Sequence, residues 1–285
     1  GAACMKASLQ AGEVVTLPNV NTIADGTAVK TPGKNVFPYL QKNQPEIIVS
    51  QMVKISGIGE SQVAEEIQDL IESQTNPTIA PYAKTGEVHL RVTASAENEK
   101  ACRKLIKPVV KELKKRFGEN VFATDESKTL EEAVIDLLKE KDLKLSLAES
   151  LTGGMIAQRI VNVSGASEVF GYGFVTYSNK AKHKCLGVKK RTLKEQGAVS
   201  AKCAREMAKG ACKASGADIS ISVTGLAGPG GGTKETPVGT VFMGCCYKGK
   251  AIAKEFHFTG NRMRIREQTT AHALAMLRDC IIMGK

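Results

Sequence analysis

The chain of 285 residues is 42% hydrophobic and 24% charged, the composition of an ordinary globular protein of about two domains. No apolar run approaches the roughly 20 residues of a membrane span, and no signal-peptide pattern opens the chain, so we expect no membrane partner. The net charge of +11 suggests an anionic partner, although much of the excess falls in residues 102–116 at the spacing of a solvated helix face. Eight scattered cysteines without C-x-x-C spacing argue against a zinc site and a disulfide framework, so we expect reduced thiols in a cytoplasmic protein.

The first 126 residues separate into two predicted segments. Residues 1–44 are rich in Gly, Pro and Asn and lack a periodic apolar face, so we do not expect an independent domain there. Residues 45–126 predict a small α+β domain. It comprises a strand in IIVSQMVKI (47–55), a helix in ESQVAEEIQDLIES (60–73), a strand in EVHLRVTA (87–94), a basic helix over about 97–116 and a short strand around NVFAT (120–124).

From residue 127 to 285 strand and helix patterns alternate. A capping box, Thr129 with Glu132 three residues on, starts the first helix. Strand patterns follow in KLSLAES (144–150), GFVTYS (173–178), DISISVTG (218–225), VGTVFMGCCY (238–247) and AIAKEFHF (251–258). Helix patterns lie between and after them, in 153–161, 200–215 and 262–281. This alternation predicts a layered α/β domain, in which sites gather beyond the carboxyl ends of strands.

The first candidate site is AESLTGG (148–154), at the end of a predicted strand. Ser150 fits either a helix N-cap or a nucleophile, and spacing alone favours the cap. As a nucleophile it would have the backbone N–H groups of Thr152, Gly153 and Gly154 nearby to hold an oxyanion. None of the four histidines lies in a glycine or turn context, so a Ser-His-Asp arrangement has no support.

Two further segments end predicted strands. In GFVTYSNKAKHKCLGV (173–188), Tyr177 and Lys182 fit a proton-accepting pair, because a desolvated lysine loses pKa and can take a serine proton. The alternative is a packed tyrosine beside a solvated lysine. The glycine-rich SVTGLAGPGGGTKETPVGT (222–240) is neither a Walker loop nor a dinucleotide fingerprint. Its length favours a ligand-binding loop over a plain hairpin connection. At the start of the last helix, Arg262, Arg264 and Arg266 fit phosphate partners, and an exposed basic first turn is the alternative for Arg264.

These stretches, in this order, resemble the C-terminal domain of the competence/damage-inducible protein CinA, the nicotinamide-nucleotide amidase family. Residues 45–126, with KISGIGES and FATDES, resemble the KH-like middle domain of that family. The resemblance implies hydrolysis of nicotinamide mononucleotide to nicotinate mononucleotide and ammonia, without a metal or other cofactor. It implies that Ser150 is the nucleophile and that Tyr177 and Lys182 act with it. The nucleotide site would then contain Glu149, Thr224, Gly225, Ala227, Gly228 and Arg262. A homodimer and a small-molecule nucleotide partner are also implied.

The sequence departs from the family pattern at three places. Leu151 stands where the family usually has Cys, which leaves the serine mechanism untouched, and Asn261 stands where it has Asp. We also find no counterpart of the molybdopterin-binding-like domain that opens full-length CinA. Instead, residues 1 to about 40 resemble an internal fragment of threonine dehydratase, a pyridoxal-phosphate enzyme. That enzyme's lysine and glycine-rich cofactor segments are missing, so we expect no dehydratase activity.

The rival interpretation is a nucleic-acid-binding, competence-related protein with an inactive amidase-like domain. KH recognition of RNA uses a G-X-X-G loop that clamps the backbone. Here the candidate glycines, Gly57 and Gly59, have the wrong spacing and Glu60 is adjacent. We therefore do not expect nucleic acid as a partner.

Overall fold

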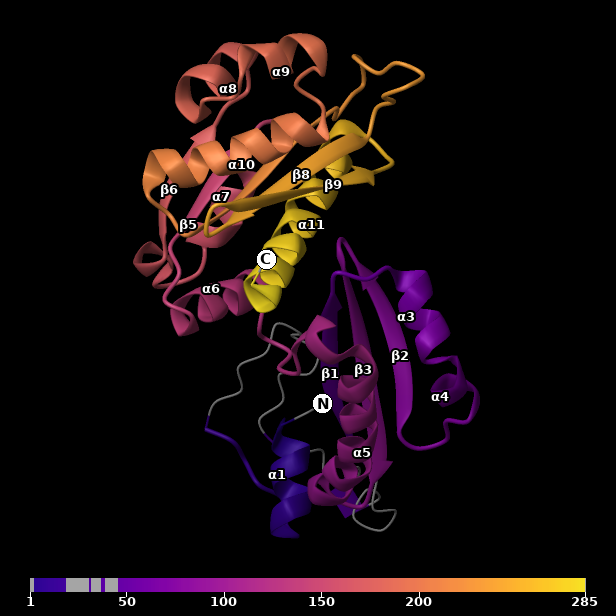
Figure 1. Cartoon of the computed structure of the whole chain (residues 1–285). Coiled ribbons are helices and arrows are strands. Elements are labelled where there is room, and N and C mark those ends of the chain that lie inside the picture. The colour runs from indigo at the N-terminus through magenta and orange to yellow at the C-terminus, as the bar shows by residue number, and fades with distance from the viewer. Residues whose placement is uncertain (1–2, 19–30, 32–36, 39–45, 285) are drawn as a thin grey trace. The chain divides into compact units, whose positions relative to one another are not determined.

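The structure is a computed structural model that describes residues 3–18, 31, 37–38 and 46–284 (Figure 1). Two compact units divide the chain: one takes in residues up to 50 with 75–78 and 93–109, and the other takes in 51–74, 79–92 and everything from 110 onward. The dehydratase-like segment expected at residues 1–44 lies largely outside the described residues; its described part contains α1 (Ala3–Ala11). Among the described helices, none has both the length and the apolar character that a membrane crossing requires.

Residues 47–123 carry a four-stranded sheet with the order β2-β3-β1-β4. Its strands are β1 (Ile47–Ser56), β2 (Thr78–Lys84), β3 (Glu87–Ala96) and β4 (Val121–Ala123), and its helices are α3 (Glu60–Glu66), α4 (Gln68–Glu72) and α5 (Glu99–Phe117). The α+β prediction is confirmed, and β3 alternates as expected, with Val88, Leu90 and Val92 buried. The single helix expected over 60–73 is wrong in detail. Ile67 leaves helical geometry there, ending α3 and beginning α4.

Residues 130–283 form a layered α/β fold around a five-stranded sheet of order β6-β5-β7-β8-β9. The strands are β5 (Leu145–Glu149), β6 (Phe170–Val175), β7 (Ile219–Gly225), β8 (Thr240–Tyr247) and β9 (Lys250–His257). One face carries α6 (Leu130–Glu140), α7 (Met155–Val161) and α11 (Arg262–Met283), and the other carries α8 (Asn179–Leu186), α9 (Lys190–Glu195) and α10 (Ala201–Ser215) (Figure 1). The predicted layered α/β architecture is confirmed.

Three loops follow the carboxyl ends of neighbouring parallel strands of the sheet. β5 is parallel to both β6 and β7, and Glu149 at its carboxyl end is in register with Val175 and Val223. All five residues of β5 are buried, as expected for a parallel strand covered on both faces. The segments after β5, β6 and β7 therefore begin side by side. They contain the three motifs singled out in the sequence.

Candidate active site

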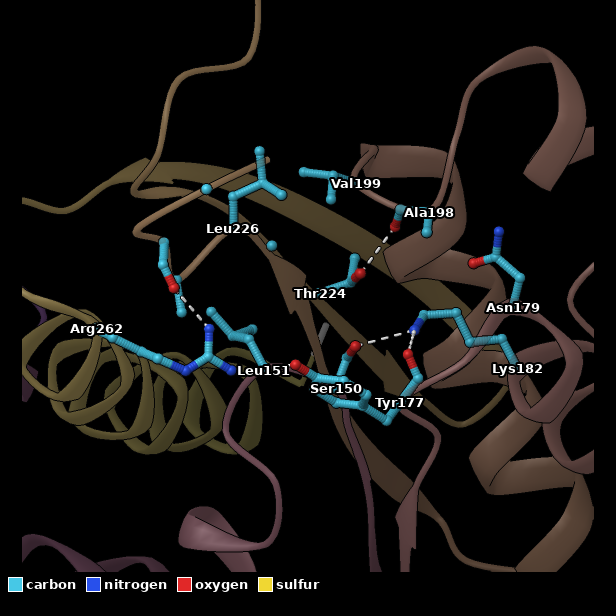
Figure 2. A pocket seen from close by; sticks show the side chains of 14 residues that line it. Ser150, Leu151, Tyr177, Asn179, Lys182, Ala198, Val199, Thr224, Leu226 and Arg262 are labelled. Atoms are coloured by element: carbon cyan, nitrogen blue, oxygen red, sulfur yellow. Dashed lines mark hydrogen bonds between the residues drawn. The ribbon is translucent and has the colours of Figure 1, made fainter. Parts of the chain in front are cut away.

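A pocket of about 290 Å³ opens at this edge of the sheet, and Figure 2 shows the residues that line it. Ser150 and Leu151 come from the segment after β5, and Tyr177, Asn179 and Lys182 from the segment that follows β6. The remaining lining residues are Ala198, Val199, Arg262 and six residues of the glycine-rich loop: Thr224, Gly225, Leu226, Ala227, Gly228 and Gly230. The sequence motifs thus converge on one cavity. Asn179, Leu226 and Gly230 belong to the predicted segments but were not singled out, and Ala198 and Val199 lie outside them.

Ser150 and Lys182 meet at the base of the pocket. Lys182 Nζ lies 2.9 Å from Ser150 Oγ and donates to the backbone carbonyl of Thr176 at 2.8 Å. The serine is 7% exposed and the lysine 1%. Ser178 caps α8, and its Oγ accepts from the N–H of Ala181 at 3.1 Å. This cap fixes the N-terminal turn of the helix, from which Lys182 projects.

Burial shifts the protonation equilibrium of Lys182 toward the neutral amine. Burial lowers the pKa of Lys182 below its ordinary value of 10.5, because an ammonium in a desolvated position loses its hydration. In the part of the chain that the structure describes, no carboxylate pairs with this lysine to offset that loss. Cys203 opposes this shift by the smaller effect of its charge, and burial raises the pKa of its own thiol to about 11. Lys182 is therefore suited to accept a proton.

The cap alternative for Ser150 is wrong, because Gly154 occupies the N-cap position of α7. Gly154 has no side chain to accept the free N–H groups at the start of α7, and the carboxylate of Glu149 accepts them instead. One of its carboxylate oxygens accepts from the N–H groups of Gly154 at 2.9 Å and Ile156 at 3.2 Å, and the other accepts from Ala157 at 2.9 Å. A carboxylate at a helix N-terminus also interacts favourably with the helix dipole. Glu149 is 1% exposed and does not line the pocket, so the substrate-binding role expected for it is corrected to a helix-capping one.

The expected oxyanion donors are only partly available. The N–H of Gly153 donates to the carbonyl of Ser150 at 3.1 Å, and that of Gly154 is taken by Glu149. Both glycines have positive φ, 61° and 100°, so their conformation explains why glycine stands at these positions. The oxyanion role expected for these two glycines is therefore corrected. Within the described residues, the N–H of Thr152 has no hydrogen-bond partner, but Thr152 is fully buried and does not line the pocket.

Tyr177 lines the pocket, but its hydroxyl has no hydrogen bond to Ser150 or Lys182 within the described residues. Its ring is 64% exposed, and its hydroxyl accepts from Arg262 Nη2 at 3.1 Å. Only its backbone carbonyl approaches Lys182 Nζ, at 3.5 Å. Arg262 also donates from Nη1 to the carbonyl of Gly228 at 2.7 Å, which links α11 to the glycine-rich loop. Figure 2 shows this arginine on the opposite side of the pocket from Lys182.

The glycine-rich loop is fixed by close backbone packing. A Cβ on Gly225 would lie 2.6 Å from the carbonyl oxygen of Thr240, and one on Gly228 would lie 2.6 Å from a methyl group of Val238. The hydroxyl of Thr224 donates to the carbonyl of Ala198 at 2.8 Å. Thr224, Gly225, Ala227 and Gly228 line the pocket, and the Thr224 hydroxyl is bonded to the protein itself. Their role in nucleotide binding stays a prediction. The described residues hold no cluster of three His, Cys, Asp or Glu side chains arranged for a metal ion.

Family models match two parts of the chain. The CinA C-terminal domain covers residues 127–281, and the damage-inducible protein CinA KH domain covers residues 50–123. Competence-damage inducible proteins of Clostridium beijerinckii and Clostridium novyi are 53% and 45% identical over 87% and 95% of this chain. The chain spans 60% and 69% of the lengths of these two relatives.

Solved structures give the same result. The competence/damage inducible protein CihA from Agrobacterium tumefaciens is 42% identical, with a TM-score of 0.51 over 52% of this chain and 91% of its own. A CinA superfamily protein from Klebsiella pneumoniae is 34% identical, with a TM-score of 0.53 over 54% of this chain and 96% of its own. The motifs, the fold and these matches together place the chain in the CinA family.

Proposed function

We propose that the chain is an amidohydrolase that converts nicotinamide mononucleotide to nicotinate mononucleotide and ammonia, a step of pyridine nucleotide salvage. The observation that carries the proposal is the 2.9 Å contact between Ser150 Oγ and a buried lysine whose pKa is lowered. A neutral amine at that distance is a base within reach of the hydroxyl proton. The substrate class in this proposal is the one implied by the resemblance of the sequence motifs to the amidase family.

The chemistry follows from the two side chains. Neutral Lys182 takes the Ser150 proton while Oγ attacks the carboxamide carbon, giving a tetrahedral oxyanion and an ammonium on the lysine. The carbonyls of Thr176 and Tyr177 face Nζ and accept hydrogen bonds from that ammonium as it forms. The lysine then protonates the leaving nitrogen, ammonia departs and an acyl-serine remains. The same lysine then takes a proton from water, whose oxygen attacks the acyl carbon. As the ester bond breaks, the lysine ammonium returns that proton to Ser150 Oγ, and the acid formed ionises to the carboxylate.

The substrate's phosphate is proposed to bind Arg262. Arg262 is the first residue of α11 and lies on the opposite side of the pocket from Lys182 (Figure 2), and its present partners are neutral oxygens. A phosphate is the stronger acceptor, because a charge-assisted hydrogen bond is about twice as strong as a neutral one. Asn261, where the family has Asp, still caps α11 by accepting from the N–H of Arg264 at 2.9 Å. The Asp-to-Asn departure therefore preserves the helix start. A homodimer and a cytoplasmic location remain part of this proposal.

The test is ammonia release from nicotinamide mononucleotide by the purified chain, Ser150→Ala and a matched control. Ser164→Ala is the control, since Ser164 is an exposed serine outside the pocket. We expect release by the native chain and the control and none above background by Ser150→Ala. Nicotinamide riboside, which lacks the phosphate, should react with a higher KM because it cannot pair with Arg262. Equal activity in the native chain and Ser150→Ala would refute the assignment.

A further inference from the structure

Two pairs of cysteines lie on opposite faces of β8. Cys245 and Cys246 are consecutive residues of this strand, so their side chains point to opposite sides of the sheet. α11 packs against one side and α10 against the other (Figure 1). The thiol of Cys245 is hydrogen-bonded to that of Cys280 in α11, and the thiol of Cys246 to that of Cys212 in α10. All four are free thiols, so each of the two helix–sheet layers holds a reduced pair.

The two pairs differ in their access to solvent. Cys245 and Cys280 are 1% and 3% exposed and belong to the hydrophobic core. Cys246 is also buried, but its partner Cys212 is only half-buried and reaches the surface in part. A thiol reacts with a reagent in solution only where it is accessible. In the folded chain, such a reagent can therefore contact the Cys212–Cys246 pair and not the Cys245–Cys280 pair.

The surroundings of the accessible pair stabilise its thiolate form. Cys212 Sγ lies 3.8 Å from the carbonyl oxygen of Cys246, so its side chain lies against the backbone of β8. The pKa of the Cys246 thiol is lowered, first by the hydrogen bond from Cys212 and then by the N–H of Gly249 and the ammonium of Lys209. The pKa of the Cys212 thiol is raised by its hydrogen bond to Cys246 and by burial. The pair therefore gives up one proton readily and holds the other between its two sulfurs.

We propose that Cys212 and Cys246 are a reversible disulfide site, which a small-molecule disulfide oxidises. Cys212 passes its proton to Cys246 while its sulfur attacks one sulfur of the reagent, so a mixed disulfide forms and a thiolate leaves. Cys246 gives the proton to that thiolate and attacks Cys212 Sγ, which breaks the mixed disulfide and releases the second thiolate. The two protein thiols lose two electrons and two protons, and the reagent is reduced to two thiols. This inference does not depend on the proposed amidase activity.

The bond would join α10 to β8 at the end of the sheet away from the pocket. Cys246 is in register with Ser220 near the start of β7, whereas the pocket lies beyond the end of that strand. The two cysteines are 34 positions apart in the chain, and a disulfide that closes a loop of this length restricts the unfolded state. We therefore expect oxidation to raise the thermal midpoint of unfolding by about 5 to 10 °C.

The experiment treats the full chain with oxidised glutathione and maps its cysteines by mass spectrometry without reduction. Cys185→Ser is the background, because Cys185 is an exposed cysteine of α8 that would react by itself. We expect a peptide in which Cys212 is linked to Cys246, an intact mass lower by two hydrogens, and reversal by dithiothreitol. Adding Cys246→Ser should stop the reaction at a mixed disulfide on Cys212, and adding Cys212→Ser should leave Cys246 unmodified. Cys280→Ala, which removes one thiol of the other pair, is the matched control and should still form the link.

Several results would overturn the inference. No reaction of the background chain would do so, as would a mixed disulfide on Cys212 that persists while Cys246 is intact. Formation of a Cys245–Cys280 link at the same rate would mean that oxidation follows opening of the core and not access to this pair. An unchanged thermal midpoint in the linked chain would contradict the restraint of α10 on β8. If the serine variants fail to fold by circular dichroism, the link and the midpoint of the background chain decide the question by themselves.

Discussion

Replacing Lys182 by Met tests the base most directly. Methionine keeps an unbranched side chain in a position that is 1% exposed and removes the amine 2.9 Å from Ser150 Oγ. Loss of a general base costs about 10²- to 10⁴-fold in rate, or about 3 to 5 kcal/mol of transition-state stabilisation. We expect the upper part of this range, because none of the four histidines lines the pocket and no second base therefore stands beside the serine. Lys182→Arg should be equally impaired, since guanidinium stays protonated.

The lowered pKa of Lys182 predicts how activity and stability change with pH. The neutral lysine is the active form, so kcat/KM of the native chain should rise with pH through a midpoint below 10.5 and then level off. Stability should change in the same direction. Between the lowered pKa and the unfolded value of 10.5 the unfolded chain binds more protons, so the free energy of unfolding rises with pH across that window. The cost of burying Lys182 is full below the window and absent above it.

The assay is ammonia release across the neutral and alkaline range, with urea unfolding at the same pH values. Lys184→Met is the matched control, because Lys184 is an exposed lysine of the same helix. Lys182→Met should lose the rise of kcat/KM with pH. It should also have a larger free energy of unfolding than the native chain, by an amount that shrinks as the pH approaches 10.5. Activity of Lys182→Met within about threefold of native, or a stability gain independent of pH, would refute the reasoning.

Three further substitutions test other parts of the site. Tyr177→Phe removes the hydroxyl that accepts a hydrogen bond from Arg262 at 3.1 Å, so it should raise KM about fivefold, the value of one hydrogen bond, and leave kcat within about threefold. A large loss of kcat in steady-state kinetics would instead support a proton-transfer role for Tyr177. Glu149→Gln should lower the free energy of unfolding by about 1 to 3 kcal/mol in urea, since an amide oxygen cannot accept all three N–H groups, and unchanged stability would contradict the capping role. Gly210→Ala should destabilise α10 against α8 by about 1 to 3 kcal/mol and lower kcat, because its Cβ would meet a carbonyl oxygen of α8 at 1.9 Å; Gly171→Ala, with open space around it, should be near neutral in the same measurements.

The sequence predicted those elements whose side chains alternate in burial. β3 alternates in burial, and β5 and all but the last residue of β7 are buried. β6 has no such pattern: it was predicted at 173–178 but lies at Phe170–Val175, with none of its residues fully buried. β2 was missed for a physical reason. Only Ile79 of its seven residues is buried, and Pro81 lies inside it, so no period and no strand propensity marked it. In the site, Ser150 and Lys182 could be paired from the sequence because a serine nucleophile needs a base, and the structure places the two side chains 2.9 Å apart.

Contacts between side chains and distant backbone left no such signal. Arg266 was one of three arginines in a basic helix start, and its partners are carbonyls, which every residue type has. One indication was available for Glu149: two glycines precede α7 and offer no capping side chain, so the helix start needed an acceptor from elsewhere. The same reasoning accounts for Leu151, which replaces the usual family Cys. Its side chain is 4% exposed within the apolar core, and its contact with Arg266 is through the carbonyl. That position therefore requires an apolar side chain of suitable volume and a fixed peptide plane, and a thiol is not needed for either.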